Sequence, residues 1–140
     1  MSDLDRELLA ERSASVLAHL DRVAAHLPDD PADLRPMSSA ADTVVLHLWQ
    51  AIQIVIDLAA SSSVRLGLGS PPTYGDAFRL LAGAEIIDAV LAERLARAAA
   101  FRNLLVHAYA ILDLTRVHAI ALRGPDDLPA FLGALRNTGD

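Results

Sequence analysis

Residues 101–109 are Phe-Arg-Asn-Leu-Leu-Val-His-Ala-Tyr, and this stretch is the strongest indication of the fold class in the sequence. At about 100° per residue of α-helix, the polar side chains of residues 102–113 share one arc of about 160°, and apolar side chains fill the opposite arc. The polar arc holds Arg102, Asn103, His107, Tyr109 and Asp113. The pattern predicts an amphipathic helix. Its polar face carries a guanidinium, an amide, an imidazole and a phenol, where a merely solvated helix favours Lys and Glu.

These side chains suit chemistry on phosphate esters. Arg102 supplies a planar fork of donors that matches a phosphate and stays charged at any relevant pH. His107 can take up and release a proton near neutral pH. A simpler interpretation stays open at this point, in which the arginine and histidine only meet water or cap nearby carbonyls at a helix end.

The motif extends beyond one arginine and one histidine. R-N-L-L-V-H-A-Y at residues 102–109 resembles the R-N-x-x-V-H-x-Y signature of the HepT-like branch of the HEPN superfamily. An upstream P-x-x-Y-x-x-x-F-x-x-L block from Pro71 to Leu81 fits the same family, as do Ile86-Ile87 and the Ile-Leu-Asp that ends at Asp113. The resemblance covers roughly residues 42 to 118. Family members often carry an arginine near residues 43–47, and this chain has none there.

The resemblance implies an all-α, HEPN-type up-down helical bundle that is dimeric. It implies a toxin of a type VII-like toxin–antitoxin pair, a ribonuclease that is neutralised by a minimal nucleotidyltransferase. By position, the partner would transfer AMP from ATP onto Tyr109. The expected substrate is RNA, either a tRNA or an mRNA, and not DNA.

Composition bounds the class of protein. With 140 residues, 53% of them hydrophobic, residues 1–140 are expected to form a single helical domain with an ample core. The absence of cysteine excludes a thiolate nucleophile and suits a cytoplasmic location. The most apolar stretch is interrupted by four polar residues, which argues against a membrane span. They are His47, Gln50, Gln53 and Asp57. The net charge of −6 opposes general RNA binding, so any such site must be locally positive.

Helical periodicity and breakers divide the chain. We expect helices over residues 3–27, from a cap at Ser38 or Ser39 to about 64, and from a Thr73 cap through 81, where Gly83 ends the helix. A fourth helix is expected to start near Glu85; residues 96–100 do not reveal whether it continues through Arg102. Asp113 is expected to cap a short helix through 122, broken by Gly124-Pro125, before a last helix from Asp126 to about 137.

Other polar residues have weaker claims to a role. Arg94 and Arg97, with Arg102, form the densest basic cluster, which predicts either contacts to an RNA backbone or a solvated face. His47 is interpreted as a satisfied core or interface histidine. Glu7 and Glu11 lack a histidine partner, and no residue set has metal-ligand spacing, so neither a metal nor another cofactor is predicted.

The predicted reaction is metal-independent cleavage of RNA by its own 2′-hydroxyl. His107 would serve the proton transfers, Arg102 would stabilise the phosphorane charge, and Asn103 would orient the imidazole or the phosphate. Arg102 and His107 lie about 140° apart around a helix, which favours a site shared by two copies. Two alternatives remain open: a non-catalytic module that docks a nucleotidyltransferase or a nucleotide, and a plain helical interaction protein.

Overall fold

The computed structural model describes residues 2–107 and 112–138, and within these ranges the chain is entirely helical. In the described part of the chain, five α-helices and one short 3-10 helix follow one another without a strand, which confirms the predicted all-α class. They are α1 (Asp3–His26), η1 (Pro31–Asp33), α2 (Ser39–Arg65), α3 (Tyr74–Gly83), α4 (Ala89–His107) and α5 (Leu114–Arg136).

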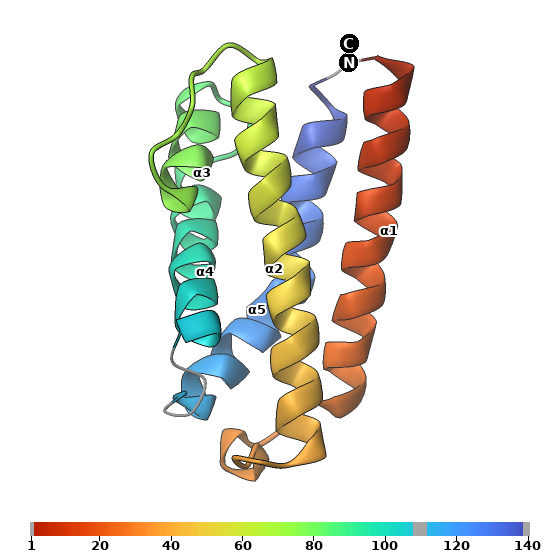
Figure 1. Cartoon of the computed structure of the whole chain (residues 1–140), viewed down its shortest axis with the longest axis vertical. Coiled ribbons are helices and arrows are strands. Elements are labelled where there is room, and N and C mark those ends of the chain that lie inside the picture. Colours follow the sequence, from red (N-terminus) through yellow and green to blue (C-terminus); the bar gives the residue numbers. More distant parts are fainter. Residues whose placement is uncertain (1, 108–111, 139–140) are drawn as a thin grey trace.

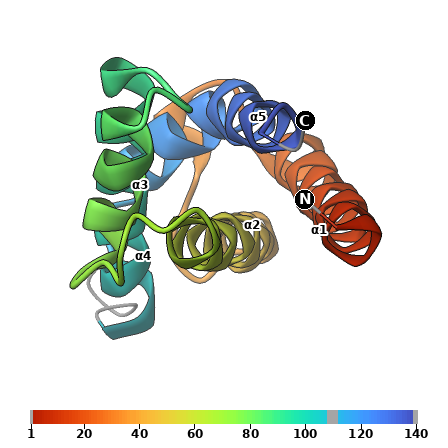
Figure 2. The same ribbon diagram turned by 90° about the horizontal axis from the view of Figure 1, so that it is seen from above.

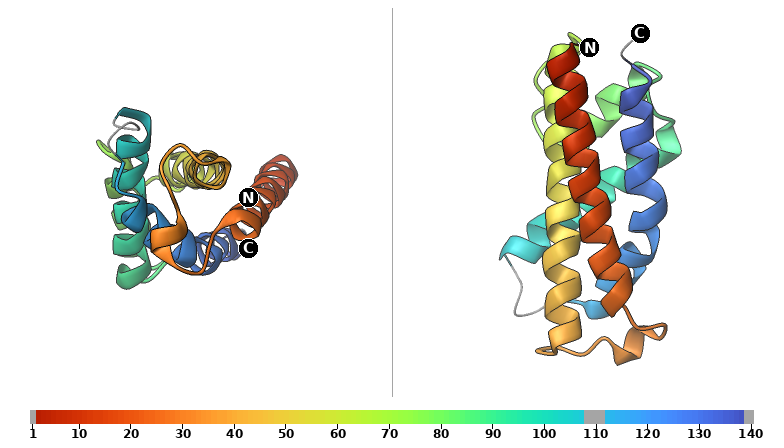
Figure 3. Two further views of the ribbon diagram at one scale, coloured as in Figure 1. Left: turned by 90° about the horizontal axis from the view of Figure 1, so that it is seen from below. Right: turned by 90° about the vertical axis from the view of Figure 1, so that its right-hand side faces the viewer.

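The long helices alternate in direction, as an up-down bundle requires. α1 and α2 pack side by side along most of their length, and α5 runs beside α1 (Figure 1). The short α3 packs mainly on α4, so these two helices form one side of the bundle when it is viewed from above (Figure 2). α4 crosses the bundle obliquely behind α2 (Figure 3). This tilt carries the end of α4 that bears the Arg102 motif outward from the long helices.

Helix α2 is the centre of the core. Eleven of its residues are buried, and it contacts α1, α3, α4 and α5. By length and composition alone α2 would also suffice to cross a membrane, but half of its most apolar window is buried against the rest of the chain. Its hydrophobicity is therefore accounted for by packing in the bundle core. Phe78 of α3 meets Phe131 of α5 edge to face, with ring centroids 5.5 Å apart, and both rings are buried in the core.

The expected start of the fourth helix near Glu85 is wrong. Glu85 has a φ of 63°, a left-handed conformation that cannot continue a right-handed helix. Its backbone N–H donates to the Ala82 carbonyl and thereby closes the end of α3. The helix begins instead at Ala89, where the Asp88 carboxylate accepts the Leu91 N–H at 2.7 Å. From Ala89, α4 runs unbroken to His107, so the fourth helix does continue through Arg102.

The expected break at Gly124-Pro125 is also wrong, because α5 is one helix that contains Pro125 and Pro129. A proline inside a helix removes a hydrogen bond and bends the axis, and α5 changes direction along its length (Figure 1). Gly124 is buried, and a Cβ there would lie 3.4 Å from Leu20 and 3.8 Å from Leu48. An added Cβ would make only ordinary van der Waals contact at these distances, so α5 packs against α1 and α2 here without requiring a glycine. The helix expected to start at Asp126 is therefore the second part of α5, and the neighbouring Asp127 is buried within it.

A histidine pair joins α1 to α2. The Nδ1 atoms of His19 and His47 are 2.9 Å apart, so one ring donates a hydrogen bond that the other accepts. This contact agrees with the interpretation of His47 as a satisfied interface residue, and the His19 ring that it meets is partly buried. Burial, and then the proximity of His47, lower the pKa of His19. A second proton on the pair would break the shared bond and place two cations in contact.

We therefore expect the bundle to lose stability under mildly acidic conditions. Because the folded-state pKa of His19 is depressed, its contribution is fully present above the unfolded histidine value of about 6.5 and is lost as pH falls below it. Urea unfolding of wild type should show a lower midpoint at mildly acidic than at neutral pH. His19→Gln should flatten that dependence, whereas His26→Gln, at an exposed helix end, should leave it in place. Equal pH dependence in all three proteins would contradict the assignment.

Candidate active site

The last two turns of α4 carry the motif residues. Phe101 and Leu105 are buried, as the helical pattern predicts, and hold this end of α4 against the core. Leu104 was expected on the same apolar arc but is 42% exposed, because α4 tilts away from the bundle here. Arg102 is partly buried and Asn103 is exposed. The core residues thus fix the helix, while the polar residues remain within reach of a ligand.

Arg102 is held by two neighbours without being neutralised. Its Nη1 donates to the Asn103 Oδ1 at 3.2 Å, and its Cζ lies 5.8 Å from the centroid of the Tyr74 ring. Its Nε is buried and has no hydrogen-bond partner among the described residues. Neither Asn103 nor Tyr74 carries a negative charge. The guanidinium therefore keeps its full charge and unused donors, which is what binding a phosphate requires.

Tyr74 is the site residue that sequence reasoning missed. It is the first residue of α3, and the Thr73 hydroxyl caps that helix by accepting the Asp76 N–H. In the sequence, Tyr74 stands out only as part of the Pro71–Leu81 block, because the sequence does not show that the start of α3 reaches the end of α4. A cavity of about 200 Å³ lies between the two helices, and Tyr74 and Asn103 are among the residues that line it.

An ion-pair network fastens α3 to α4 beside this cavity. Arg79 of α3 donates to the Glu93 carboxylate through Nε at 3.0 Å and through Nη2 at 3.3 Å, and it also meets Asp76 at 3.3 Å. The hydrogen bond to Glu93 is the main reason that the pKa of Arg79 is raised and that of Glu93 lowered. Arg79 is thereby committed to the scaffold. Arg102 is left as the cation with free donors at this end of the α3–α4 pair within the described part of the chain.

The structure describes some of the predicted site residues but not all of them. Arg102 and Asn103 lie together, whereas His107 is described only as the last residue of α4, and its side chain is outside the description. Tyr109 lies outside the described residues. Asp113 was grouped with this helix face and was also expected to cap the next helix; the cap is confirmed, because its carboxylate accepts the Thr115 N–H at 3.0 Å at the start of α5.

Arg94 and Arg97 lie on α4 but differ in their surroundings. The Arg94 Nε donates to both carboxylate oxygens of Asp127 on α5, each at 3.1 Å. Arg97 is exposed and forms no ion pair with a carboxylate among the described residues. Both arginines line a cavity between α4 and α5. Arg94 thus has a bridging role between helices, which the sequence did not suggest.

Solved structures resemble this fold along nearly its whole length. A toxin–antitoxin crystal structure with AMP-PNP matches with a TM-score of 0.83 at 23% identity, covering 94% of this chain and 98% of its own. A tri-AMPylated Shewanella oneidensis HEPN toxin in complex with MNT antitoxin matches with a TM-score of 0.82 at 24% identity, covering 98% and 99%. YutE, a cytosolic Bacillus subtilis protein of unknown function, matches at 0.79 with 16% identity, covering 96% and 90%. The architecture is that of a HEPN helical bundle.

Sequence comparison narrows this class to a family. The sequence model of the family called "Ribonuclease HepT-like" matches residues 16–135. The mRNA nuclease HepT of Shewanella oneidensis is 30% identical over 95 residues, which cover 68% of this chain and 71% of that protein. The chain belongs to the HepT-like ribonuclease family. The resemblance carried by residues 102–109 is thereby confirmed at the level of family.

Proposed function

We propose that this chain is the ribonuclease toxin of a type VII-like toxin–antitoxin pair and that Arg102 and His107 are its catalytic residues. The observation that carries the proposal is the state of Arg102: it is placed by Tyr74 and Asn103, keeps its charge, and stands five residues before a histidine on one helix. The relative named mRNA nuclease HepT supports the same activity. Asn103 positions the guanidinium through the 3.2 Å hydrogen bond.

The reaction needs only groups that the chain and the RNA supply. A base removes the proton of the ribose 2′-hydroxyl, and that oxygen attacks the adjacent phosphorus. The bond from phosphorus to the 5′-oxygen breaks, and this oxygen takes up a proton. The products are a 2′,3′-cyclic phosphate and a 5′-hydroxyl. His107 is suited to the proton transfers by its pKa range, and Arg102 to the charge that develops on the phosphoryl oxygens.

We propose that the working unit is a homodimer. On α4, Arg102 and His107 are five residues apart, so their positions point about 140° apart around the axis. Two copies across a twofold axis would bring the arginine of one near the histidine of the other. Sedimentation velocity at micromolar concentration should therefore show a dimer. A protein that is monomeric throughout and still fully active would contradict the shared site.

The proposed partner is a minimal nucleotidyltransferase that acts as antitoxin. The toxin–antitoxin complex with AMP-PNP and the complex of the Shewanella oneidensis toxin with MNT antitoxin support this pairing for a chain of the same fold. We further propose that residues 1–140 act as one HEPN domain in the cytoplasm, where the RNA substrate, a tRNA or an mRNA, is found.

Purified protein tests the function directly. It should cleave RNA in the presence of EDTA and leave 2′,3′-cyclic phosphate ends, which alkaline phosphatase does not remove before acid treatment. Binding of a nucleotidyltransferase without any cleavage would instead favour the non-catalytic module, a reading that the net charge of −6 makes worth testing. Cleavage that EDTA abolishes would contradict the metal-independent mechanism.

Tyr74 gives a finer test of how Arg102 is positioned. A cation–π contact of this kind is worth about 0.5–1 kcal/mol, which corresponds to roughly two- to fivefold in rate. Tyr74→Ala should therefore lower kcat by about that factor, whereas Tyr74→Phe, which keeps the ring, should restore it. Circular dichroism should show equal helix content in both variants. If Tyr74→Phe is as slow as Tyr74→Ala, the ring face is not what positions Arg102.

A further inference from the structure

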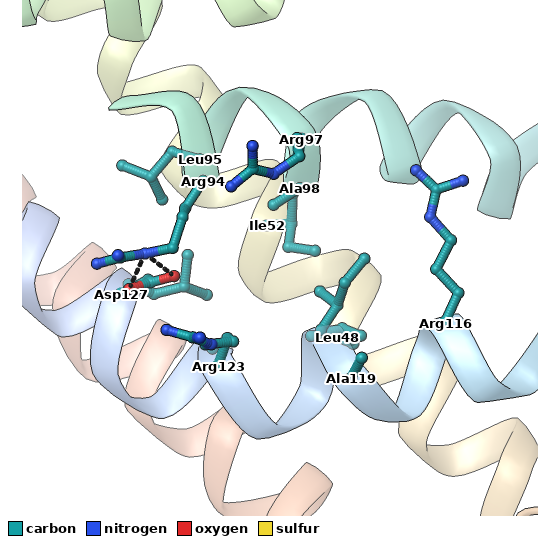
Figure 4. Close-up of a pocket in the computed structure, with 13 residues that line it drawn as sticks. Leu48, Ile52, Arg94, Leu95, Arg97, Ala98, Arg116, Ala119, Arg123 and Asp127 are labelled. Carbon is teal, nitrogen blue, oxygen red and sulfur yellow. Dashed lines mark hydrogen bonds and ion pairs between the residues drawn. The ribbon is translucent and has the colours of Figure 1, made fainter. Parts of the chain in front are cut away.

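A cavity of about 250 Å³ lies between α4 and α5, with α2 behind it (Figure 4). Its floor is apolar and is formed largely by Leu48 and Ile52 of α2 with Leu95 of α4. Arginines stand around it: Arg94 and Arg97 come from α4, and Arg116 and Arg123 come from α5 (Figure 4). This arginine pocket, defined by these four arginines and their apolar floor, contains neither Arg102 nor Asn103 among its lining residues.

The arginine pocket is strongly positive in a protein that is negative overall. Asp127 is the one acid that lines it, and Arg94 neutralises that carboxylate through two contacts of 3.1 Å. Arg97, Arg116 and Arg123 form no ion pair with a carboxylate within residues 2–107 and 112–138. Three exposed guanidinium groups therefore line one cavity, whereas the chain as a whole carries −6. Like charges gathered around one cavity raise the local positive potential and favour an anion there.

Arg116 is held in place by a contact that leaves its charge intact. Its Cζ lies 5.6 Å from the ring centroid of Phe101, a buried residue of α4, so the side chain spans from α5 towards α4. A guanidinium supported by an aromatic ring has lost part of its rotational freedom before a ligand arrives. Less entropy is then lost on binding, and the planar fork is already presented to an incoming phosphate.

The combination of an apolar floor and a guanidinium rim fits one class of ligand. A nucleobase presents a flat face that packs on aliphatic side chains or on arginine planes, and its phosphates accept hydrogen bonds from the same arginines. A cavity of about 250 Å³ lies just below the usual ligand-site range of about 300–1,000 Å³, which suits one nucleotide and not an extended peptide.

We propose that the arginine pocket is a nucleotide-binding site, separate from the Arg102 site, that holds one unpaired nucleotide with its base on the apolar floor and its phosphates on Arg97, Arg116 and Arg123. The nucleotide comes either from an RNA strand or from the free pool. In the first case the pocket anchors the substrate, and only that source rests on the proposed ribonuclease function.

The test measures binding in a protein that does not cleave. In the full-length His107→Ala background, fluorescence anisotropy follows a labelled single-stranded oligoribonucleotide. Replacing Arg97, Arg116 and Arg123 together by Gln should weaken binding about tenfold or more, and the slope of log K against log salt should fall by about 0.7 for each lost phosphate contact. Arg12→Gln, an exposed arginine of α1, is the matched control and should change neither quantity.

A second variant tests the pocket without removing an arginine. Ala119 is exposed at the pocket edge on α5, so Ala119→Glu should fold normally and place a carboxylate beside the three guanidinium groups. It should weaken binding as the triple variant does. Competition by 5′-AMP would show that the pocket takes free nucleotides. Binding of the oligonucleotide without competition by 5′-AMP would show that the bound nucleotide belongs to an RNA strand.

The proposal is overturned if the triple variant keeps wild-type affinity and salt dependence for both the oligonucleotide and 5′-AMP. It is overturned equally if the substitutions change only self-association or capture of the nucleotidyltransferase, since the pocket would then be a protein interface. Because binding is measured without cleavage, a chain that binds through the pocket but never cleaves RNA would refute the proposed function and leave the pocket standing.

Discussion

Arg102→Ala and His107→Ala should each reduce the rate of RNA cleavage by a factor on the order of 10² to 10³, with little loss of stability. Arg102 is partly buried, but the contacts of its guanidinium are one hydrogen bond to Asn103 and one ring contact with Tyr74. Both contacts are on the protein surface and do not join the core. Removing the guanidinium therefore removes charge stabilisation at the phosphate and not the fold.

Matched controls separate chemistry from general effects. Arg12→Ala and His26→Ala remove one arginine and one histidine from the exposed side of α1 and should cleave at the wild-type rate. Thermal unfolding should place all four variants close to wild type. Expression of wild type should arrest growth, and expression of Arg102→Ala or His107→Ala should not. Near wild-type cleavage by either of these two variants would show that the assigned residues are not the catalytic ones.

The predictable part of the fold was set by local signals. The ranges of α1, α2 and α3 follow from apolar periodicity and from capping side chains: the Ser38 hydroxyl accepts the Ala41 N–H, and the Thr73 hydroxyl accepts the Asp76 N–H. Each of these contacts joins residues three positions apart, so the capping pattern can be recognised from the sequence alone. The errors arose where tertiary packing overrode local preference. Gly124-Pro125 is typical of a helix break, but Gly124 is buried against the other helices, and α5 continues through the proline with a bend.

The candidate site was predictable only along one helix. Arg102 and Asn103 are adjacent in sequence, so their contact could be anticipated, whereas Tyr74 reaches Arg102 from another helix. The same limit applied to the arginines. Arg94 and Arg97 were noticed because they are close in sequence, but Arg116 and Arg123 belong to the same cavity only because α5 folds back along α4. The pairing of Arg94 with Asp127 joins positions 33 residues apart, which no local pattern indicates.

Tyr109→Phe should make the toxin resistant to neutralisation by AMP transfer. In the proposed step, the tyrosine oxygen attacks the α-phosphorus of ATP, pyrophosphate leaves, and the phenolic proton passes to a base. Tyr109 follows His107, the last residue of α4, by two positions, so their Cα atoms can be at most about 7 Å apart. An AMP group there places a bulky phosphodiester with a negative charge near the catalytic residues, where it competes for Arg102 and repels the RNA backbone. The Shewanella oneidensis toxin of the same fold is tri-AMPylated in complex with its MNT antitoxin.

The sequence makes this experiment unusually clean, since the chain has two tyrosines. Mass spectrometry after co-expression with the cognate nucleotidyltransferase should find AMP on the peptide that contains Tyr109 and none on the peptide that contains Tyr74. Tyr74→Phe should still be modified and neutralised, whereas Tyr109→Phe should remain toxic in the presence of the partner and ATP. The phenol is not needed for either proton transfer, because its reference pKa of about 10 is far from neutral, so Tyr109→Phe should also cleave RNA on its own. A fully neutralised complex in which Tyr109 carries no AMP would show that the partner inhibits by covering the site.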